Sequence, residues 1–132
     1  MKGQAAFEFL VYVSVVLLIM AYFFWNTLSL QNQSMHAKID AEAKKISDTV
    51  AFEINSAVRL GNGYSRKFFV PESFSGITDF SIRVGEYGVF FEWGGKSIVS
   101  SIVIKNITNT DTINSGLNLI ENRNGNIYVT RI

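Results

Sequence analysis

The sequence opens with an apolar run, Gln4 to Trp25, and contains no glycine or proline from there until Gly61. The stretch has neither of the residues that usually end a helix, so we expect one helix from Gln4 to Leu60. At ~1.5 Å per residue that helix is about 85 Å long, and its apolar segment alone nearly crosses a ~30 Å hydrocarbon layer. A chain of 132 residues supplies one modest domain beside it. Much of the helix must therefore be buried by partners outside a single copy.

The character of this helix changes along its length. Residues 4–25 are apolar on every side, which requires lipid or protein all around them. Residues 26–34 are polar, but they lack glycine and proline and should continue the helix. Further on, apolar side chains recur at helical spacing and predict an amphipathic segment 26–60: Met35, Ile39, Ala43, Ile46, Val50, Ile54 and Ala57.

Polar residues are expected on the opposite side of that segment. They include Lys44, Asp48, Asn55 and Arg59, and Asp40 is placed to pair with Lys44 four residues later. Two residues depart from the pattern, since Glu53 falls inside the apolar stripe and Phe52 outside it. We interpret Phe52 as part of a second contact surface.

Residues 64–132 have the alternating pattern of β-strands. Gly61-Asn62-Gly63 should end the helix, Gly94-Gly95 and Asn124-Gly125 favour hairpin turns, and Ser100-Ser101 is a candidate bulge. The Asn- and Thr-rich residues 106–114 are expected to form an exposed loop or an edge strand. We predict an α+β fold in which four to six antiparallel strands form a sheet, and one face of that sheet covers the amphipathic helix. The expected strands are 66–70, 80–84, 89–93, 97–104, 117–120 and 126–132.

Composition argues against several classes of function. The net charge of +1 gives no electrostatic case for nucleic acid binding. The chain has no cysteine, and its one histidine, His36, is expected on the solvated helix surface without clustered metal ligands. We find no Ser/His/Asp set, no carboxylate pair in a credible cleft and no phosphate-binding glycine loop. We therefore expect neither an enzyme nor a bound cofactor.

Glu8 is the most informative residue of the apolar run. A charge within such a segment costs roughly 2.5–3.5 kcal/mol on insertion scales, so it points to a function. A cleavable secretory signal would be shorter and followed by small residues, whereas Phe23-Phe24-Trp25 are large. A simple anchor fits better, because Lys2 places the N-terminus in the cytoplasm and the interfacial aromatics Tyr22 and Trp25 mark the far end. An anchor, however, does not need Glu8.

The residues Lys2-Gly3-Gln4-Ala5-Ala6-Phe7-Glu8-Phe9-Leu10 resemble the N-terminal motif of archaeal type IV pilin precursors with class III signal peptides. Ala6 and Tyr12 depart from the commonest pattern, in which Ser and Leu stand at these places. A looser resemblance is the Pro-x-x-apolar-x-Gly stretch from Pro71 to Gly76, which leads into the strand at Phe80-Ser81-Ile82. The remaining strands match this family only as a pattern.

The resemblance implies a division of the chain. Residues 1–3 would be a leader that a prepilin peptidase removes between Gly3 and Gln4. Residues 4–25 would span the plasma membrane in the precursor and form the filament core afterwards, with the β domain of residues 64–132 at the cell surface. The implied partners are further copies of the chain and a membrane assembly machine, and the implied roles are adhesion, surface attachment or motility. The expected core residues are Phe7, Phe9, Leu10, Tyr12, Val16, Phe23, Phe24 and Trp25.

Physical chemistry gives this motif a mechanism. Cleavage after Gly3 removes Lys2 and creates an ammonium group on Gln4, one helical turn from Glu8. The Glu8 carboxylate then lies near the positive end of the helix dipole and can pair with that ammonium or with one from a neighbouring copy. An unpaired charge in a low-dielectric core is costly, so this pair favours the correct axial register.

A second hypothesis remains open: a single-pass anchor that carries a monomeric β domain for binding a ligand or a carbohydrate. A membrane-anchored enzyme is a third. Asn32 and Asn106 begin acceptor sequons for N-glycosylation. The aromatic residues of the apolar run are interpreted as packing groups rather than as a path for charge transport.

Overall fold

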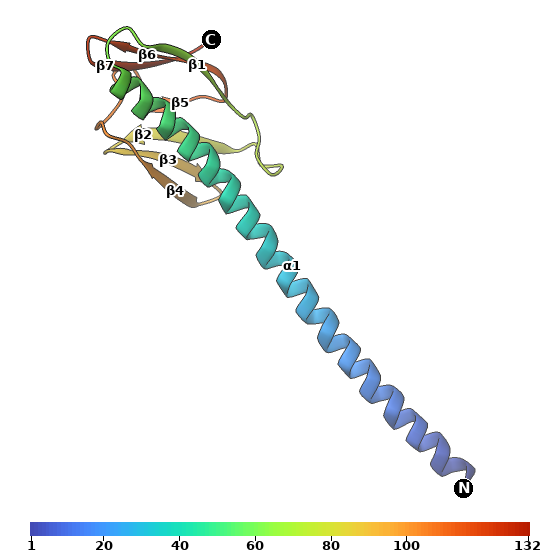
Figure 1. The fold of residues 1–132 in the computed structure, drawn as a ribbon. Helices are drawn as coiled ribbons and strands as arrows, with labels where there is room; N and C mark the ends of the chain where they lie inside the picture. The colour runs from blue at the N-terminus through green and yellow to red at the C-terminus, as the bar shows by residue number, and fades with distance from the viewer. The chain divides into compact units, whose positions relative to one another are not determined.

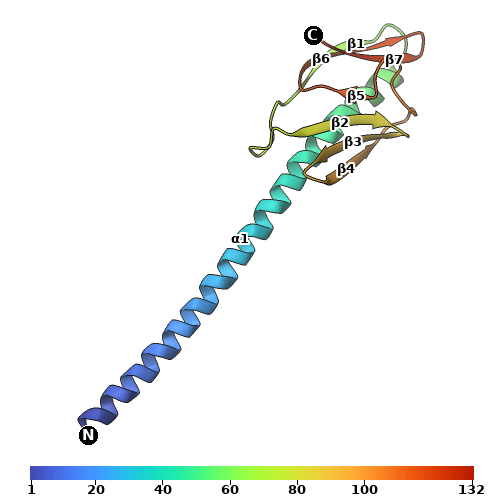
Figure 2. The same ribbon diagram turned by 180° about the vertical axis from the view of Figure 1, so that it is seen from behind.

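A computed structural model describes residues 1–132, apart from the side chain of Lys2. One long helix, α1 (Lys2–Leu60), precedes seven strands (Figures 1 and 2). The predicted α+β arrangement, a long N-terminal helix packed on a small antiparallel β domain, is confirmed. The chain divides into two units, residues 1–38 and residues 39–132, which are described separately.

Helix α1 is continuous, as its lack of glycine and proline predicts. It starts at Lys2, two residues before the expected first residue, and ends at Leu60. Gly61 follows with a φ of 80°, a left-handed conformation that glycine adopts without steric cost. The carbonyl of Ala57, near the helix end, accepts a hydrogen bond from the side-chain amide of Asn122 at 2.9 Å. The Gly-Asn-Gly stop signal was therefore correct.

The strands form two antiparallel sheets, where we expected a single one. One contains β1 (Ser65–Val70), β6 (Gly116–Arg123) and β7 (Asn126–Arg131), in the order β1-β6-β7. The other contains β2 (Phe80–Gly85), β3 (Gly88–Trp93), β4 (Lys96–Ser101) and β5 (Thr112–Ile113), in the order β4-β3-β2-β5. The prediction of four to six strands was too low, because β5 is two residues long and has no pattern to detect. It does lie in the 106–114 stretch that we expected to be a loop or an edge strand, and it pairs with β2.

The turns and one bulge can be compared with their predictions. Asn124 and Gly125 join β6 to β7 with φ angles of 54° and 85°, which confirms the Asn-Gly hairpin. The bulge at Ser100-Ser101 was wrong. The pairing of β3 with β4 continues in register through both serines, and the buried Ser100 side chain bonds Lys44 of α1.

The apolar stripe of α1 faces the β domain. Ala43, Val50, Ile54 and Ala57 are buried, Ile39 and Ile46 are partly buried, and Met35, which belongs to the N-terminal unit, is exposed. Glu53, which falls in the stripe, is buried together with the apolar residues around it. Its carboxylate lies 3.6 Å from the Arg66 guanidinium of β1. Phe52 is exposed, as its position outside the stripe predicts.

Of the four polar residues expected on the far side of α1, Lys44, Asp48 and Arg59 are exposed as predicted, and Asn55 is partly buried. Lys44 and Asn55 also contact the β domain. The Lys44 ammonium donates to the Val99 carbonyl at 3.2 Å, and the side chain of Asn55 bonds the Ser101 carbonyl and the Val103 amide at 3.3 and 2.9 Å. These bonds cover the outer edge of β4, which would otherwise present unpaired backbone groups. The sequence pattern marks a polar residue but does not distinguish solvent from a strand edge.

Ion pairing on α1 also differs from the prediction. Lys44 pairs with Asp48 at 2.7 Å and not with Asp40, which pairs with Lys96 of β4 at 3.4 Å. The Ser100 hydroxyl donates to Asp48 at 2.6 Å and accepts from Lys44 at 2.9 Å. Hydrogen bonds from Lys44 and Ser100 hold the pKa of Asp48 below its ordinary value.

The lowered pKa of Asp48 predicts an acid-dependent loss of stability. The ionised carboxylate stabilises the fold fully above the unfolded-state pKa of 3.8, and this contribution disappears as the pH falls through the lower pKa of the folded state. Because the pair is half exposed, Asp48→Asn should cost only about 0.5–1 kcal/mol near pH 7. The cost should become smaller as the pH falls below 3.8. Urea unfolding at pH 7 and at the lowest pH at which the chain stays folded measures it, with Asp111→Asn as the control, and an equal cost at both pH values would contradict this assignment.

Candidate functional site

The apolar segment of α1, residues 4–25, is uncovered along its whole length in a single copy. All eight expected core residues are exposed, from 54% for Val16 to 77% for Trp25. This segment supplies a window of mean hydropathy 2.3, none of it buried, which by length and composition is enough to cross a membrane. Burial against lipid or protein is what such a surface requires.

The polar side chains in and just after the segment bond to the helix itself. Ser14 donates to the Leu10 carbonyl at 2.7 Å, Asn26 to the Tyr22 carbonyl at 3.0 Å and Thr27 to the Phe23 carbonyl at 2.9 Å. A polar group that is already bonded loses less when it leaves water. These residues are therefore compatible with an apolar environment.

The predicted processing and register residues lie together at the start of α1. Gly3 and Gln4 are in the first turn, and the Gln4 side-chain amide donates to the Glu8 carboxylate at 3.4 Å. Glu8 is exposed and lies one turn from the Gln4 backbone, as the spacing predicts. The Glu8 carboxylate can accept a hydrogen bond from an ammonium group at position 4, either of the same chain or of a second chain.

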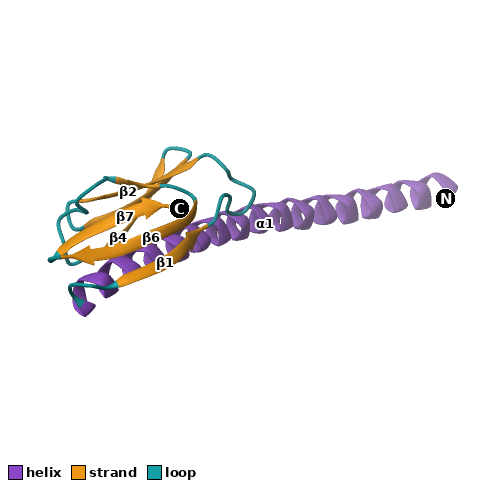
Figure 3. Cartoon of the chain, turned by 90° about the horizontal axis from the view of Figure 1, so that it is seen from above, coloured by secondary structure: helices purple, strands orange, loops and turns teal.

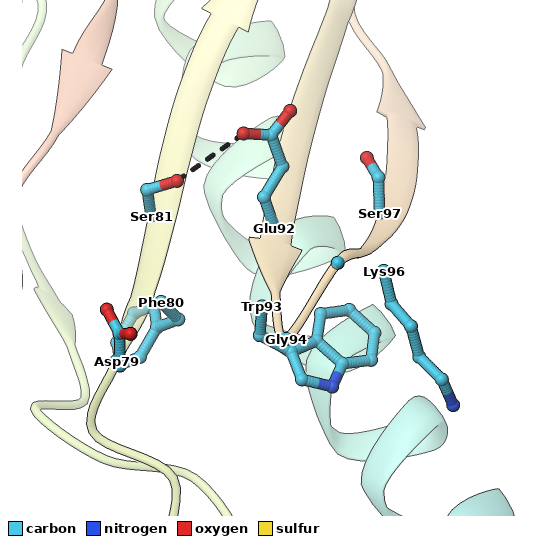
Figure 4. A pocket seen from close by; sticks show the side chains of 9 residues that line it. Asp79, Phe80, Ser81, Glu92, Trp93, Gly94, Lys96 and Ser97 are labelled. Carbon is cyan, nitrogen blue, oxygen red and sulfur yellow. Dashed lines mark hydrogen bonds between the residues drawn. The ribbon is translucent and has the colours of Figure 1, made fainter.

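A hollow in the β domain was not predicted from the sequence. It has a volume of about 410 Å³ and lies where β2, β3 and β4 start or end (Figure 4). Its walls include Asp79, Ser81, Glu92, Trp93 and Lys96. Glu92 accepts from Ser81 and from Arg83, each at 3.5 Å, and Trp93 is only 7% exposed. These residues come from three consecutive strands, and the pairing of β2 with β3 and of β3 with β4 brings them together.

The remaining candidates have simple surroundings. Asn32 and Asn106, the two sequon residues, are both exposed, Asn32 on α1 and Asn106 in the loop between β4 and β5. His36 is exposed on α1. Among the side chains that the structure describes, no group of His, Asp and Glu has the arrangement of a metal site.

The chain thus combines an exposed apolar helix segment, a carboxylate one turn from its start, and a folded β domain. No protein-family model, curated protein or solved structure matches the chain.

Proposed function

We propose that the chain is the structural subunit of a type IV pilus-like surface filament, which polymerises through residues 4–25 of α1 and serves adhesion, surface attachment or motility. One observation carries the proposal: this segment is exposed on every side in a single copy and contains one charged residue, Glu8. Lipid alone would satisfy the apolar side chains but leaves the carboxylate costly. Packing against copies satisfies both.

The driving force is the packing of the large apolar side chains against the same segment of other copies. In the membrane the segment already has apolar surroundings, so association there relies on packing and polar pairing. We therefore assign Phe7 through Trp25 to the filament core and Glu8 to its register.

Processing before Gln4 prepares the chain for this step. It removes Lys2, a positive charge that holds the N-terminus at the cytoplasmic face, and leaves an ammonium on Gln4. A prepilin peptidase and a membrane assembly machine are the partners that the family resemblance implies. The β domain remains outside the membrane throughout.

The alternative, a monomeric anchored binding module, would use the hollow around Trp93. The side chains there favour it less. A carbohydrate platform needs an accessible aromatic face, but Trp93 is 7% exposed, and Glu92 is engaged by Ser81 and Arg83.

The mature N-terminus tests the processing step. Intact mass measurement of chains from surface material should give a chain that begins at Gln4, without Met1-Lys2-Gly3. Recovery of full-length chains from assembled material would defeat this part of the proposal.

A variant of Gly3 provides a control. A Cβ at position 3 would meet nothing within 4 Å, so Gly3→Leu should leave the fold and the helix intact. If the peptidase requires a small residue before the cleavage site, as the resemblance implies, this variant should accumulate uncleaved in the membrane.

A further inference from the structure

Two asparagine residues of the chain are followed directly by glycine, in Asn62-Gly63 and Asn124-Gly125. In such a dipeptide the glycine nitrogen can attack the side-chain amide carbon of the asparagine, because glycine has no side chain to hinder the approach. Asparagine is for this reason among the thermolabile residues of proteins. Both asparagines are exposed to water, so their reactivity depends on whether the glycine nitrogen is free to attack.

The fold brings the two dipeptides together. Asn62-Gly63 directly follows the end of α1, and Asn124-Gly125 forms the turn between β6 and β7 (Figure 3). The backbone amide of Asn124 donates to the side-chain oxygen Oδ1 of Asn62 at 2.8 Å. The two dipeptides are therefore neighbours, although they are far apart in the sequence.

Asn122 of β6 accepts hydrogen bonds from the nitrogens of both glycines. Its backbone carbonyl accepts from the Gly63 amide at 2.9 Å, and its side-chain oxygen Oδ1 accepts from the Gly125 amide, also at 2.9 Å. Asn122 is 3% exposed, and its Nδ2 group donates to the Ala57 carbonyl at 2.9 Å, which fixes the side chain. Each glycine nitrogen must leave its hydrogen bond before it can attack, and this local opening costs free energy.

The two glycine nitrogens are held in different ways. The Gly63 amide bonds a backbone carbonyl, and the side chain of Asn62 is itself held by the amide of Asn124. The Gly125 amide bonds a side chain, which can rotate away while the strand stays paired. Position 124 is therefore the one at which a single side chain controls the reaction.

We propose that Asn124 is a site of spontaneous deamidation, and that the Asn122 side chain controls its rate. When Oδ1 of Asn122 releases the Gly125 amide, the Gly125 nitrogen forms a bond to Cγ of Asn124. The bond between Cγ and Nδ2 breaks, and ammonia leaves with the proton of the glycine amide. Water then opens the cyclic imide to aspartate or to isoaspartate, and isoaspartate lengthens the backbone of the β6–β7 turn. This chemistry goes beyond the proposed function and does not depend on assembly.

The unaltered full chain in detergent gives the first test. Chains are incubated at mildly alkaline pH, either folded or in guanidinium chloride that unfolds the β domain. Peptide mass and separation of the isoaspartyl forms follow the conversion of Asn62 and of Asn124. Conversion of Asn124 should be at least ~10-fold slower in the folded chain, because attack requires the Gly125 hydrogen bond to open. Equal rates in the two conditions would overturn the proposal.

A substitution of Asn122 gives the second test. Asn122→Leu keeps the approximate volume of the side chain and removes Oδ1. In the folded variant, Asn124 should convert at least ~5-fold faster than in the parent chain, because its glycine nitrogen is released. Asn62 should stay within about twofold of the parent, since the carbonyl that holds Gly63 belongs to the backbone. Asn122→Ala gives the same comparison if leucine is not accommodated.

Asn118→Ala is the matched control. Asn118 is a second buried asparagine of β6, 1% exposed, and its side chain donates to the carbonyls of Asn114 and Gly116. This variant should leave the conversion of Asn124 within about twofold of the parent.

Three results with a folded Asn122 variant would overturn the proposal. The first is an unchanged rate at Asn124. The other two are an equal rise at Asn62 and Asn124, and the same rise in Asn118→Ala, because both would indicate general unfolding. If neither Asn122 variant folds, the comparison of folded and unfolded parent chains decides.

Discussion

Replacing Glu8 with glutamine should abolish filament assembly while leaving insertion into the membrane intact. In the proposed core the Glu8 carboxylate pairs with the ammonium of Gln4, and glutamine leaves that ammonium without its partner. Removing one member of a buried pair costs about 3–5 kcal/mol, which is a factor of at least ~100 in an assembly equilibrium. The measurement is the amount of chain in surface-sheared fibres relative to the amount in the membrane fraction. We expect the amount in sheared fibres to fall below detection and the amount in the membrane fraction to stay constant.

A matched control separates the position of Glu8 from the loss of any carboxylate. Glu121 lies on β6 and pairs with Arg123 at the domain surface, so Glu121→Gln makes the same chemical change outside the apolar segment. It should assemble as the parent does, since a surface pair contributes at most about 1 kcal/mol. Normal fibres from Glu8→Gln would remove the proposed role of Glu8 in register.

Replacing Phe74 with alanine should destabilise the β domain by about 3–5 kcal/mol, the usual cost of deleting a buried aromatic side chain. Phe74 is 1% exposed and lies in the loop between β1 and β2. Its ring packs edge-on against Phe80, Phe91 and Trp93 at centroid distances of 5.5, 5.0 and 5.7 Å. The backbone amide of Phe74 donates to the carbonyl of Ile77 at 3.0 Å, and the amide of Ile77 donates to the carbonyl of Phe74 at 2.8 Å. Ring packing and backbone bonds together hold the loop that leads into β2.

Phe52→Ala is the control for this prediction, because it deletes the same ring from an exposed site. Its cost should stay within about 0.5 kcal/mol. Urea unfolding of the full chain in detergent, followed by near-ultraviolet circular dichroism, compares the two. A cost below about 1 kcal/mol for Phe74→Ala would show that this aromatic cluster does not hold the domain together.

The features that could be predicted from sequence are those that depend on local patterns. The length of α1 follows from the lack of glycine and proline. Its end follows from Gly61, and the β6–β7 turn from Asn124-Gly125. The burial of Ala43, Val50 and Ile54 follows from their helical spacing. The exposed apolar segment was equally predictable, because composition alone defines it.

The features that were missed depend on contacts between distant segments. The turn between β2 and β3 uses Glu86 and Tyr87, with φ angles of 49° and 64°, where glycine or asparagine is usual. The backbone of Tyr87 bonds those of Ile102 and Lys105, and these bonds support a conformation that the local residues disfavour. Gly85 and Gly88 mark the place of the turn in the sequence, but not the positive φ angles of the two residues between them.

Buried polar residues were missed for the same reason. Asn122 is 3% exposed, and its side chain bonds the carbonyl of Ala57 and the amide of Gly125, each at 2.9 Å. It thereby ties the end of α1 to the β6–β7 hairpin. As an isolated asparagine beside a turn, it has the sequence appearance of a loop residue. Lys44 and Asn55 were predicted only as polar residues of the outer helix face, because their hydrogen bonds to β4 form only in the tertiary fold.

The central claim is that residues 4–25 exchange lipid for the same segment of other copies. Electron cryomicroscopy of material sheared from the cell surface tests it most directly. We expect helical fibres whose core consists of packed 4–25 segments, with Gln4 as the first residue and Glu8 beside an ammonium group. Recovery of the chain only by detergent, as single uncleaved copies with no fibres in the sheared fraction, would contradict the claim.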